Sequence, residues 1–235
     1  MDSARWPRYD ARPMSQIGPP APRILPPYRF KDLLRRFGGS RFSLLDIGAG
    51  NHSASLAKLW FPACHYAGVD RTRDYGNDAA DFAAMDEFYE LDLTTLEFGA
   101  IPDGAYDALL LAHVIEHLPN GDEVLRRLLP KLKPGGLAYV EFPAQRSTTF
   151  PSMRGTLNFY DDETHVRIYS IDELTKLFTS SGFTVVRATT RRDPLRIALT
   201  PLLALRARWM LGYVPGGTFW DLFGFADVVV ANAPR

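Results

Sequence analysis

The alternation of apolar and polar positions along the chain predicts short buried strands separated by helices and turns. Seven apolar runs have the length of buried strands, at residues 42–47, 65–69, 88–93, 106–112, 137–142, 183–188 and 225–231. Segments with helical spacing or turn residues lie between them. This order predicts a parallel sheet with helices on both faces, which is an α/β, doubly wound, Rossmann-like fold.

Residues that begin and end helices support this arrangement. A helix over residues 28–37 should end at Gly38-Gly39, and a second over residues 53–60 should end at Phe61-Pro62. Two further helices are predicted to begin at capping boxes, Asn120 with Glu123 and Ser170 with Glu173. Residues 133–136, Lys-Pro-Gly-Gly, predict a turn into the fifth strand.

The amino-terminal residues differ in composition from the rest. Residues 1–27 contain seven prolines and four arginines, so we expect a flexible proline-rich tail, followed by one domain over residues 28–235 with insertions at 144–164 and 194–222. The alternative is a lid formed by Trp6, Tyr9 and Met14. The lone Cys64 excludes an internal disulfide, and no signal-like apolar run begins the chain, so we expect a cytoplasmic protein.

Charge narrows the range of partners. The chain has 27 basic and 27 acidic residues, so we expect no nucleic-acid partner. Residues 195–214 are apolar, but Pro201 and three arginines argue against a membrane span. We expect a helix packed on the domain, with aromatic residues of the core at Trp209, Phe219, Trp220 and Phe223. Alternatively, this helix covers an apolar acceptor, forms a homodimer surface or makes peripheral contact with lipid.

Candidate chemistry begins where the first strand ends. Asp46 is followed by Gly48-Ala49-Gly50, and glycines let backbone approach a ligand closely. Asp70 ends the second strand, where a carboxylate can accept both hydroxyls of a ribose. A dinucleotide fingerprint needs a third glycine where Ser53 stands, and Asp46 would repel a pyrophosphate. These features favour S-adenosylmethionine over NAD, although an NAD-dependent oxidoreductase remains an alternative.

The order of the motifs resembles that of class I S-adenosylmethionine-dependent methyltransferases, especially the small-molecule group that includes ubiquinone-type O-methyltransferases. The resemblance covers about residues 42–183. The matching pieces are Leu45-Asp46-Ile47-Gly48-Ala49-Gly50, Gly68-Val69-Asp70, Leu91-Asp92-Leu93, His113-Val114-Ile115-Glu116-His117-Leu118, Leu132-Lys133-Pro134-Gly135-Gly136 and His165-Val166-Arg167. The family often has a further glycine where this chain has His52. That departure motivates the alternative of an interaction module that binds cofactor weakly.

The resemblance implies a seven-stranded, mostly parallel sheet with an antiparallel last strand, and S-adenosylmethionine as the cofactor. It assigns the methionine end to the glycine loop, the ribose to the second strand end and the adenine to the third. The cofactor-binding candidates are therefore Asp46, Gly48, Ala49, Gly50, Asp70, Asp92, Leu93 and His113.

Catalytic candidates follow the fourth strand. His113 and His117 lie at the sheet edge where open α/β proteins bind ligands, and an imidazole can accept a hydroxyl proton. With Glu116 and distant His165 they contain the ligand types of a metal site, but these pieces are common without metal, so we expect none. The fourth strand ends in Ala112-His113 and not in the Asn/Asp-Pro-Pro loop of many N-methyltransferases, which favours methylation of a small molecule at oxygen. Residues 144–164 are expected to shape its pocket or to form a surface loop.

Overall fold

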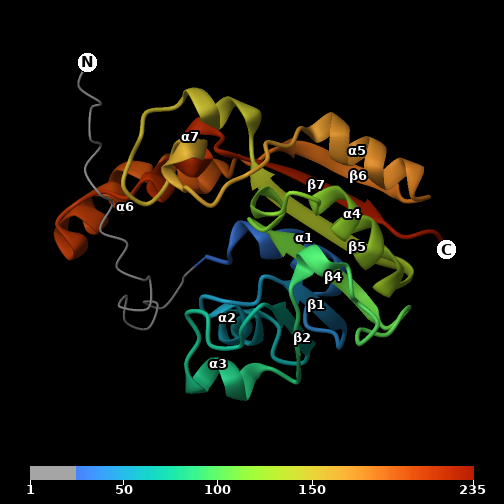
Figure 1. Ribbon diagram of the computed structural model, residues 1–235. Coiled ribbons are helices and arrows are strands. Elements are labelled where there is room, and N and C mark those ends of the chain that lie inside the picture. The colour runs from blue at the N-terminus through green and yellow to red at the C-terminus, as the bar shows by residue number, and fades with distance from the viewer. Residues whose placement is uncertain (1–24) are drawn as a thin grey trace.

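The computed structural model describes residues 25–235 of the chain. The lid residues considered above, Trp6, Tyr9 and Met14, lie outside the described part. The residues that are described form a central twisted sheet with helices on its two faces (Figure 1).

Seven strands form one sheet, with the order β3-β2-β1-β4-β5-β7-β6. All neighbouring strands run parallel except β7, which is antiparallel to both β5 and β6. The expected doubly wound sheet with an antiparallel last strand is therefore confirmed. The strand bounds are β1 Ser43–Ile47, β2 His65–Asp70, β3 Glu87–Glu90, β4 Tyr106–Ala112, β5 Leu132–Pro143, β6 Thr184–Thr190 and β7 Ala226–Asn232.

The helices alternate with these strands. The α-helices are α1 Lys31–Phe37, α2 Ser53–Trp60, α3 Ala79–Ala84, α4 Gly121–Leu128, α5 Ile171–Ser180, α6 Pro194–Leu211 and α7 Trp220–Phe223. The 3-10 helices are η2 Tyr28–Phe30, η3 Leu93–Thr95, η4 Ile115–His117, η5 Leu129–Lys131, η6 Gln145–Thr149, η7 Phe159–Asp161 and η8 Gly216–Phe219. The helices at residues 28–37 and 53–60 are confirmed, the first as a 3-10 turn that leads into α1.

Successive residues of the central strands face two separate cores. Leu45 of β1 belongs to the core under α4 and α5, where Val124 and Leu177 are buried. Its neighbour Leu44 belongs to the opposite core, with Leu33 of α1 among its members. Both cores consist of buried apolar side chains, so the central strands are apolar on both faces and appear in the sequence as continuous apolar runs.

Three local predictions were wrong. The third strand ends at Glu90, because Asp92 accepts a hydrogen bond from the Thr94 amide and begins η3. Residues 133–136 lie inside β5, at an irregularity in its pairing with β4 where Gly135 has φ +73°, and do not precede the strand. Asn120 precedes α4 but makes no side-chain cap; its side-chain Nδ2 donates to the Thr94 carbonyl, and its Oδ1 accepts no hydrogen bond. The Ser170–Glu173 capping box is confirmed.

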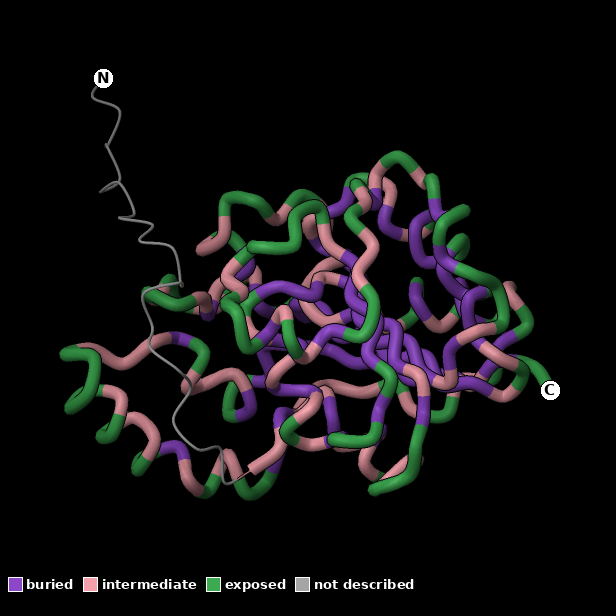
Figure 2. The backbone as a smooth tube through the Cα atoms, turned by 90° about the horizontal axis from the view of Figure 1, so that it is seen from below, coloured by how far each residue is buried: buried purple, intermediate pink, exposed green. Residues whose placement is uncertain are grey.

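The insertion before β7 forms α6, which projects beyond the edge of the sheet (Figures 1 and 2). The expectation of core aromatics was wrong: Trp209 is 85% exposed, Phe223 is 41% exposed, and Phe219 and Trp220 are only half-buried and belong to neither core. Most α6 residues are exposed or half-buried, and Thr200 is its one buried residue. Within residues 25–235, none of the helices combines the length and the apolar composition that a membrane span requires.

Candidate functional site

The strand order reverses between β1 and β4, and the candidate residues gather at the carboxyl ends of these two strands. β1 pairs with β2 on one side and with β4 on the other, so the chain leaves β1 and β4 toward opposite faces of the sheet. A crevice at such a switch point is the usual ligand site of an open α/β sheet. Gly48 follows β1 and His113 follows β4.

The glycine loop has no room for side chains at its two glycines. Gly48 has φ +79°, and a Cβ there would collide with the Val114 side chain. A Cβ on Gly50 would collide with the ring and carbonyl of Tyr75. The loop is held by hydrogen bonds from the amides of Gly48 and Ala49 to the Val69 carbonyl. Glycine is therefore required by close approach at both positions.

Asp46 lies beneath the loop. Its carboxylate is 3% exposed and accepts hydrogen bonds from Ser53 Oγ at 2.6 Å and from the Tyr66 hydroxyl at 2.7 Å. Burial raises the pKa of Asp46. Arg29 also donates to Ser53 Oγ, so Asp46 ties β1, β2 and the start of α2 together behind the loop.

His52 is turned away from the crevice toward α3. It adopts the left-handed conformation, and its Nδ1 lies 2.6 Å from Asp81 Oδ2. Asp81 is fully buried and also receives hydrogen bonds from the Ser55 amide and hydroxyl. Burial acts to raise the pKa of Asp81, but these hydrogen bonds and the imidazole hold it below its ordinary value. The His52 ring, at a position where the family often has glycine, is thus held outside the glycine loop by its contact with Asp81.

Asp70 ends β2 beside the glycine loop, and Asp92 lies shortly after β3. Asp70 accepts a hydrogen bond from the Arg71 amide, and its Oδ2 lies 3.4 Å from where a Gly50 Cβ would stand. Burial raises the pKa of Asp70. Asp92 is exposed and precedes Leu93, and its Oδ2 lies 3.8 Å from Arg71 Nε.

His113 belongs to a buried ionic network. Its Nδ1 lies 3.1 Å from Glu116 Oε1 and its Nε2 lies 3.2 Å from Glu141 Oε1. Burial acts to lower the pKa of His113, but the two carboxylates outweigh it and raise the pKa to about 9. Arg191 donates to Glu141 at 2.8 Å and to Asp221. The His113 ring is therefore protonated on both nitrogens and positively charged at neutral pH.

Glu116, His117 and His165 form a second group beside this network. The His165 Nδ1 lies 2.6 Å from the Phe159 carbonyl, which fixes its proton there and leaves Nε2 as an acceptor. Nε2 lies 4.0 Å from Glu116 Oε1, and Glu116 Oε2 is buried without a hydrogen-bond partner. His117 contacts Thr164 Oγ1 at 2.8 Å through Nδ1. The possible ligand atoms of these three side chains all lie within 4.8 Å of one another. The fold therefore brings His165 next to Glu116 and His117, although they are far apart in the sequence.

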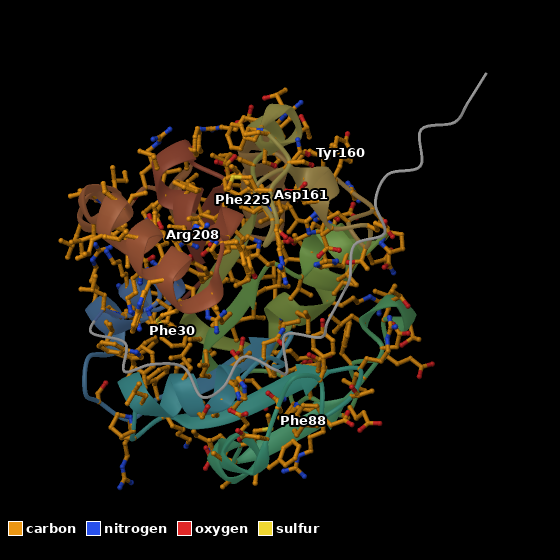
Figure 3. The ribbon with its side chains drawn as sticks, turned by 90° about the vertical axis from the view of Figure 1, so that its left-hand side faces the viewer. Phe30, Phe88, Tyr160, Asp161, Arg208 and Phe225 are labelled. Atoms are coloured by element: carbon orange, nitrogen blue, oxygen red, sulfur yellow. The ribbon has the colours of Figure 1, made fainter. Side chains whose placement is uncertain are left out.

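The loop between residues 144 and 164 closes one side of this group. Asp161 accepts hydrogen bonds from the amides of Met153, Leu157 and Asn158, so one carboxylate organises the turn. Phe159 is buried against His165, whereas Tyr160 is 65% exposed (Figure 3). The aromatic residues of the loop are thus divided between core and surface.

The sequence analysis assigned no role in the site to three residues that shape it. Tyr75 lies over Gly50, Trp220 packs against the His113 ring with centroids 4.8 Å apart, and Asp81 holds His52. Tyr75 and Asp81 follow β2 in a segment without apolar periodicity. Trp220 lies more than one hundred residues beyond His113. A local signal exists for Asp81 alone: it stands three residues after Asp78, with which it forms a capping box.

A separate hollow of about 780 Å³ lies at the opposite edge of the sheet, with Arg41, Lys58 and Asp86 among its lining residues. It is at the amino ends of the strands. Parallel sheets bind ligands at their carboxyl ends, so we do not assign the function to it.

Comparisons with known proteins identify the family and the fold. A family model described as a methyltransferase domain matches residues 23–188, more than half of the chain. The fold is similar to that of a S-adenosylmethionine-dependent methyltransferase from Archaeoglobus fulgidus, with 20% identity, a TM-score of 0.54 and coverage of 86% of this chain and 91% of that one.

Two further structures show the range of functions on this fold. The [4+2]-cyclase SpnF is 20% identical, with a TM-score of 0.57 and coverage of 88% of this chain and 81% of that one. Phosphoethanolamine N-methyltransferase 2 of Haemonchus contortus, solved with S-adenosyl-L-methionine, is 18% identical, with a TM-score of 0.60 and coverage of 87% and 52%. At these identities the likeness establishes the fold alone.

Proposed function

The chain belongs to the methyltransferase domain family of S-adenosylmethionine-dependent enzymes, and on this premise we propose that it transfers the cofactor's methyl group to an oxygen of a small molecule. The observation that carries the proposal is the juxtaposition, at the strand switch point, of a side-chain-free glycine loop with a carboxylate. On one side lie Gly48, Gly50 and Asp70, and on the other lies a group with free acceptor atoms after β4. The family match argues against the oxidoreductase alternative.

The residues of the glycine loop fit an S-adenosyl group. In our proposal, backbone at Gly48, Ala49 and Gly50 lies against the methionine end, and Asp70 accepts the ribose hydroxyls. Asp92 and the Leu93 backbone line the site of the adenine. Tyr75 must turn aside from Gly50, which it can do because its side chain is 61% exposed. Asp46 supports the loop from beneath, since its hydrogen bonds to Ser53 and Tyr66 already occupy it.

The bound cofactor supplies a methyl group already activated by the sulfonium, so the chain has to position the acceptor and exclude water. His117 is the proposed proton acceptor, because it is half-buried beside the crevice and lies in η4, which follows β4. The unpartnered Glu116 Oε2 can accept a hydrogen bond from the acceptor's hydroxyl. Together they would orient one oxygen and remove its proton.

His113 has a different role in this proposal from the one that its sequence position suggested. Its pKa of about 9 makes it a proton donor at neutral pH, so it cannot serve as the base. We propose that its ion pair with Glu116 fixes that carboxylate beside the crevice. Trp220 covers its ring and limits the access of water.

A methyltransferase assay with an acceptor screen tests the proposal. Purified protein is incubated with S-adenosylmethionine carrying a labelled methyl group and with phenols, hydroxy acids, sugars or polyketide-like alcohols. The proposal predicts label on an oxygen of at least one class, lost in a Gly48→Val variant. Label found on nitrogen or carbon alone, with no oxygen product, would overturn the assignment of the acceptor atom.

A further inference from the structure

The exposed side of α6 carries an apolar ridge. Leu195, Ala198, Leu202, Leu205 and Trp209 repeat at spacings of three and four residues, which places them on one face of the helix. Four of them are strongly exposed, at 50% for Leu195, 62% for Leu202, 68% for Leu205 and 85% for Trp209. The opposite side of the helix, with Thr200, faces the protein. We call these five residues the α6 ridge.

Every charge on α6 is positive. The helix contains Arg196, Arg206 and Arg208 and no acidic residue. Arg206 and Arg208 lie on opposite sides of the α6 ridge, and neither forms an ion pair with any residue in the described range 25–235. Figure 3 labels Arg208 on this helix, on the side of the molecule that faces the viewer. The nearest acids along the chain, Asp193 and Asp221, are buried and paired with Lys31 and Arg191.

This combination favours an anionic lipid surface as the occupant. A second copy of α6 would bring arginines together without an acidic residue on the helix to pair with them. Residues 1–24 of the chain contain four arginines and two aspartates, so their charge does not complement the helix either. An exposed leucine and tryptophan face with flanking arginines is the composition of helices that lie in a membrane interface.

We propose that α6 docks on the surface of anionic membranes, with the α6 ridge inserted among the lipids and Arg206 and Arg208 against the headgroups. The helix lies on the bilayer and does not cross it, since its arginines exclude a span. Leu222 and Phe223 of α7, which packs beside α6, are also exposed and extend the apolar surface. Because Trp220 of α7 contacts His113, the docked face is continuous with the proposed acceptor side.

Vesicle flotation with the full-length protein tests this proposal. We expect binding to vesicles of phosphatidylcholine with phosphatidylserine, and much weaker binding to phosphatidylcholine alone. The double variant Arg206→Gln/Arg208→Gln should weaken partition by roughly 30-fold, since each basic side chain at an anionic surface contributes about a factor of five. High salt should weaken the wild type in the same direction. The variant Leu202→Ser/Trp209→Ser should lose binding to both vesicle types.

Matched variants separate a docking face from general surface effects. Arg126→Gln/Arg127→Gln makes the same charge change on α4, and Leu59→Ser/Val186→Ser removes two other exposed apolar side chains. Both should bind vesicles as the wild type does. Equal loss in these controls, absence of vesicle binding by the wild type, or a dimer in sedimentation velocity that only the ridge variant dissociates would each overturn the proposal. Unchanged thermal unfolding establishes that the variants are folded.

Discussion

His113 and Glu141 form a buried contact in which Nε2 of the imidazole lies 3.2 Å from the carboxylate Oε1. Glu141 is 2% exposed and is also bound by Arg191. Burial acts to raise the pKa of Glu141, but the charges of Arg191 and His113 outweigh it and hold that pKa far below its ordinary value. The contact therefore joins two charged groups at neutral pH.

The first prediction concerns the pH dependence of stability. A histidine whose pKa rises on folding, from 6.5 to about 9, stabilises the fold fully below pH 6.5 and loses that contribution as pH rises through 9. The destabilisation caused by His113→Asn should be larger at pH 6 than at pH 10 by on the order of 3 kcal/mol. Denaturant unfolding of both proteins across this range measures it. A difference independent of pH would show that His113 is not charged in the native state.

Alanine substitutions at two glycines with positive φ distinguish two contributions to the free energy of unfolding. One is the cost of the backbone conformation, and the other is the cost of a steric collision. Gly104 has φ +61° and open space around it, so Gly104→Ala should lower the free energy of unfolding by about 1–2 kcal/mol. At Gly48 the added Cβ also collides with Val114, so Gly48→Ala should cost about 1–3 kcal/mol more. Equal losses in denaturant unfolding would mean that the crevice has room at Gly48.

Much of this fold was predictable, because it depends on local patterns. Leu44 and Leu45 belong to opposite cores, and a strand with both neighbours apolar reads as buried from its sequence alone. The Ser170–Glu173 box likewise acts within one turn of helix. Trp209 could not be placed in this way, because an apolar helix reads the same whether its face meets the core or projects outward.

The candidate site was only partly predictable. The sequence placed Asp70 and His117 at the correct sheet edge, since strand ends in a parallel sheet share that edge. It could not reveal that Glu141 and Glu116 raise the pKa of His113, because Glu141 is an ordinary strand residue 28 positions away. Nor could it show that His52 turns toward Asp81, a contact between two separate helices.

The role of His117 is testable once an acceptor is known. Loss of a general base should reduce kcat by roughly 10²–10⁴-fold in His117→Ala while S-adenosylmethionine affinity stays near that of the wild type. His65→Ala, which removes an exposed imidazole at the opposite edge of the sheet, is the control and should keep full activity. If His117→Ala turns over the acceptor at the wild-type rate from pH 5 to 9, proximity and desolvation alone remain as the mechanism.

We predict that methyl transfer needs no metal. His165 Nε2 and Glu116 Oε1 lie 4.0 Å apart, wider than the separation of about 3.4 Å between ligand atoms on a tetrahedral zinc ion. Activity should survive treatment with a chelator, and elemental analysis should find no stoichiometric transition metal. The prediction is wrong if the protein holds one equivalent of zinc, iron or manganese that His165→Ala removes.

Calorimetry with S-adenosylmethionine and S-adenosylhomocysteine tests the central claim most directly, because it needs no acceptor. We expect both to bind, NAD not to bind, and Asp70→Ala to weaken S-adenosylmethionine binding by about 1–3 kcal/mol through loss of hydrogen bonds to a carboxylate. Glu97→Ala, which removes an exposed acid elsewhere, should bind as the wild type does. Absence of binding by the wild-type protein would favour an interaction module, and unchanged affinity in Asp70→Ala would contradict the proposed pocket.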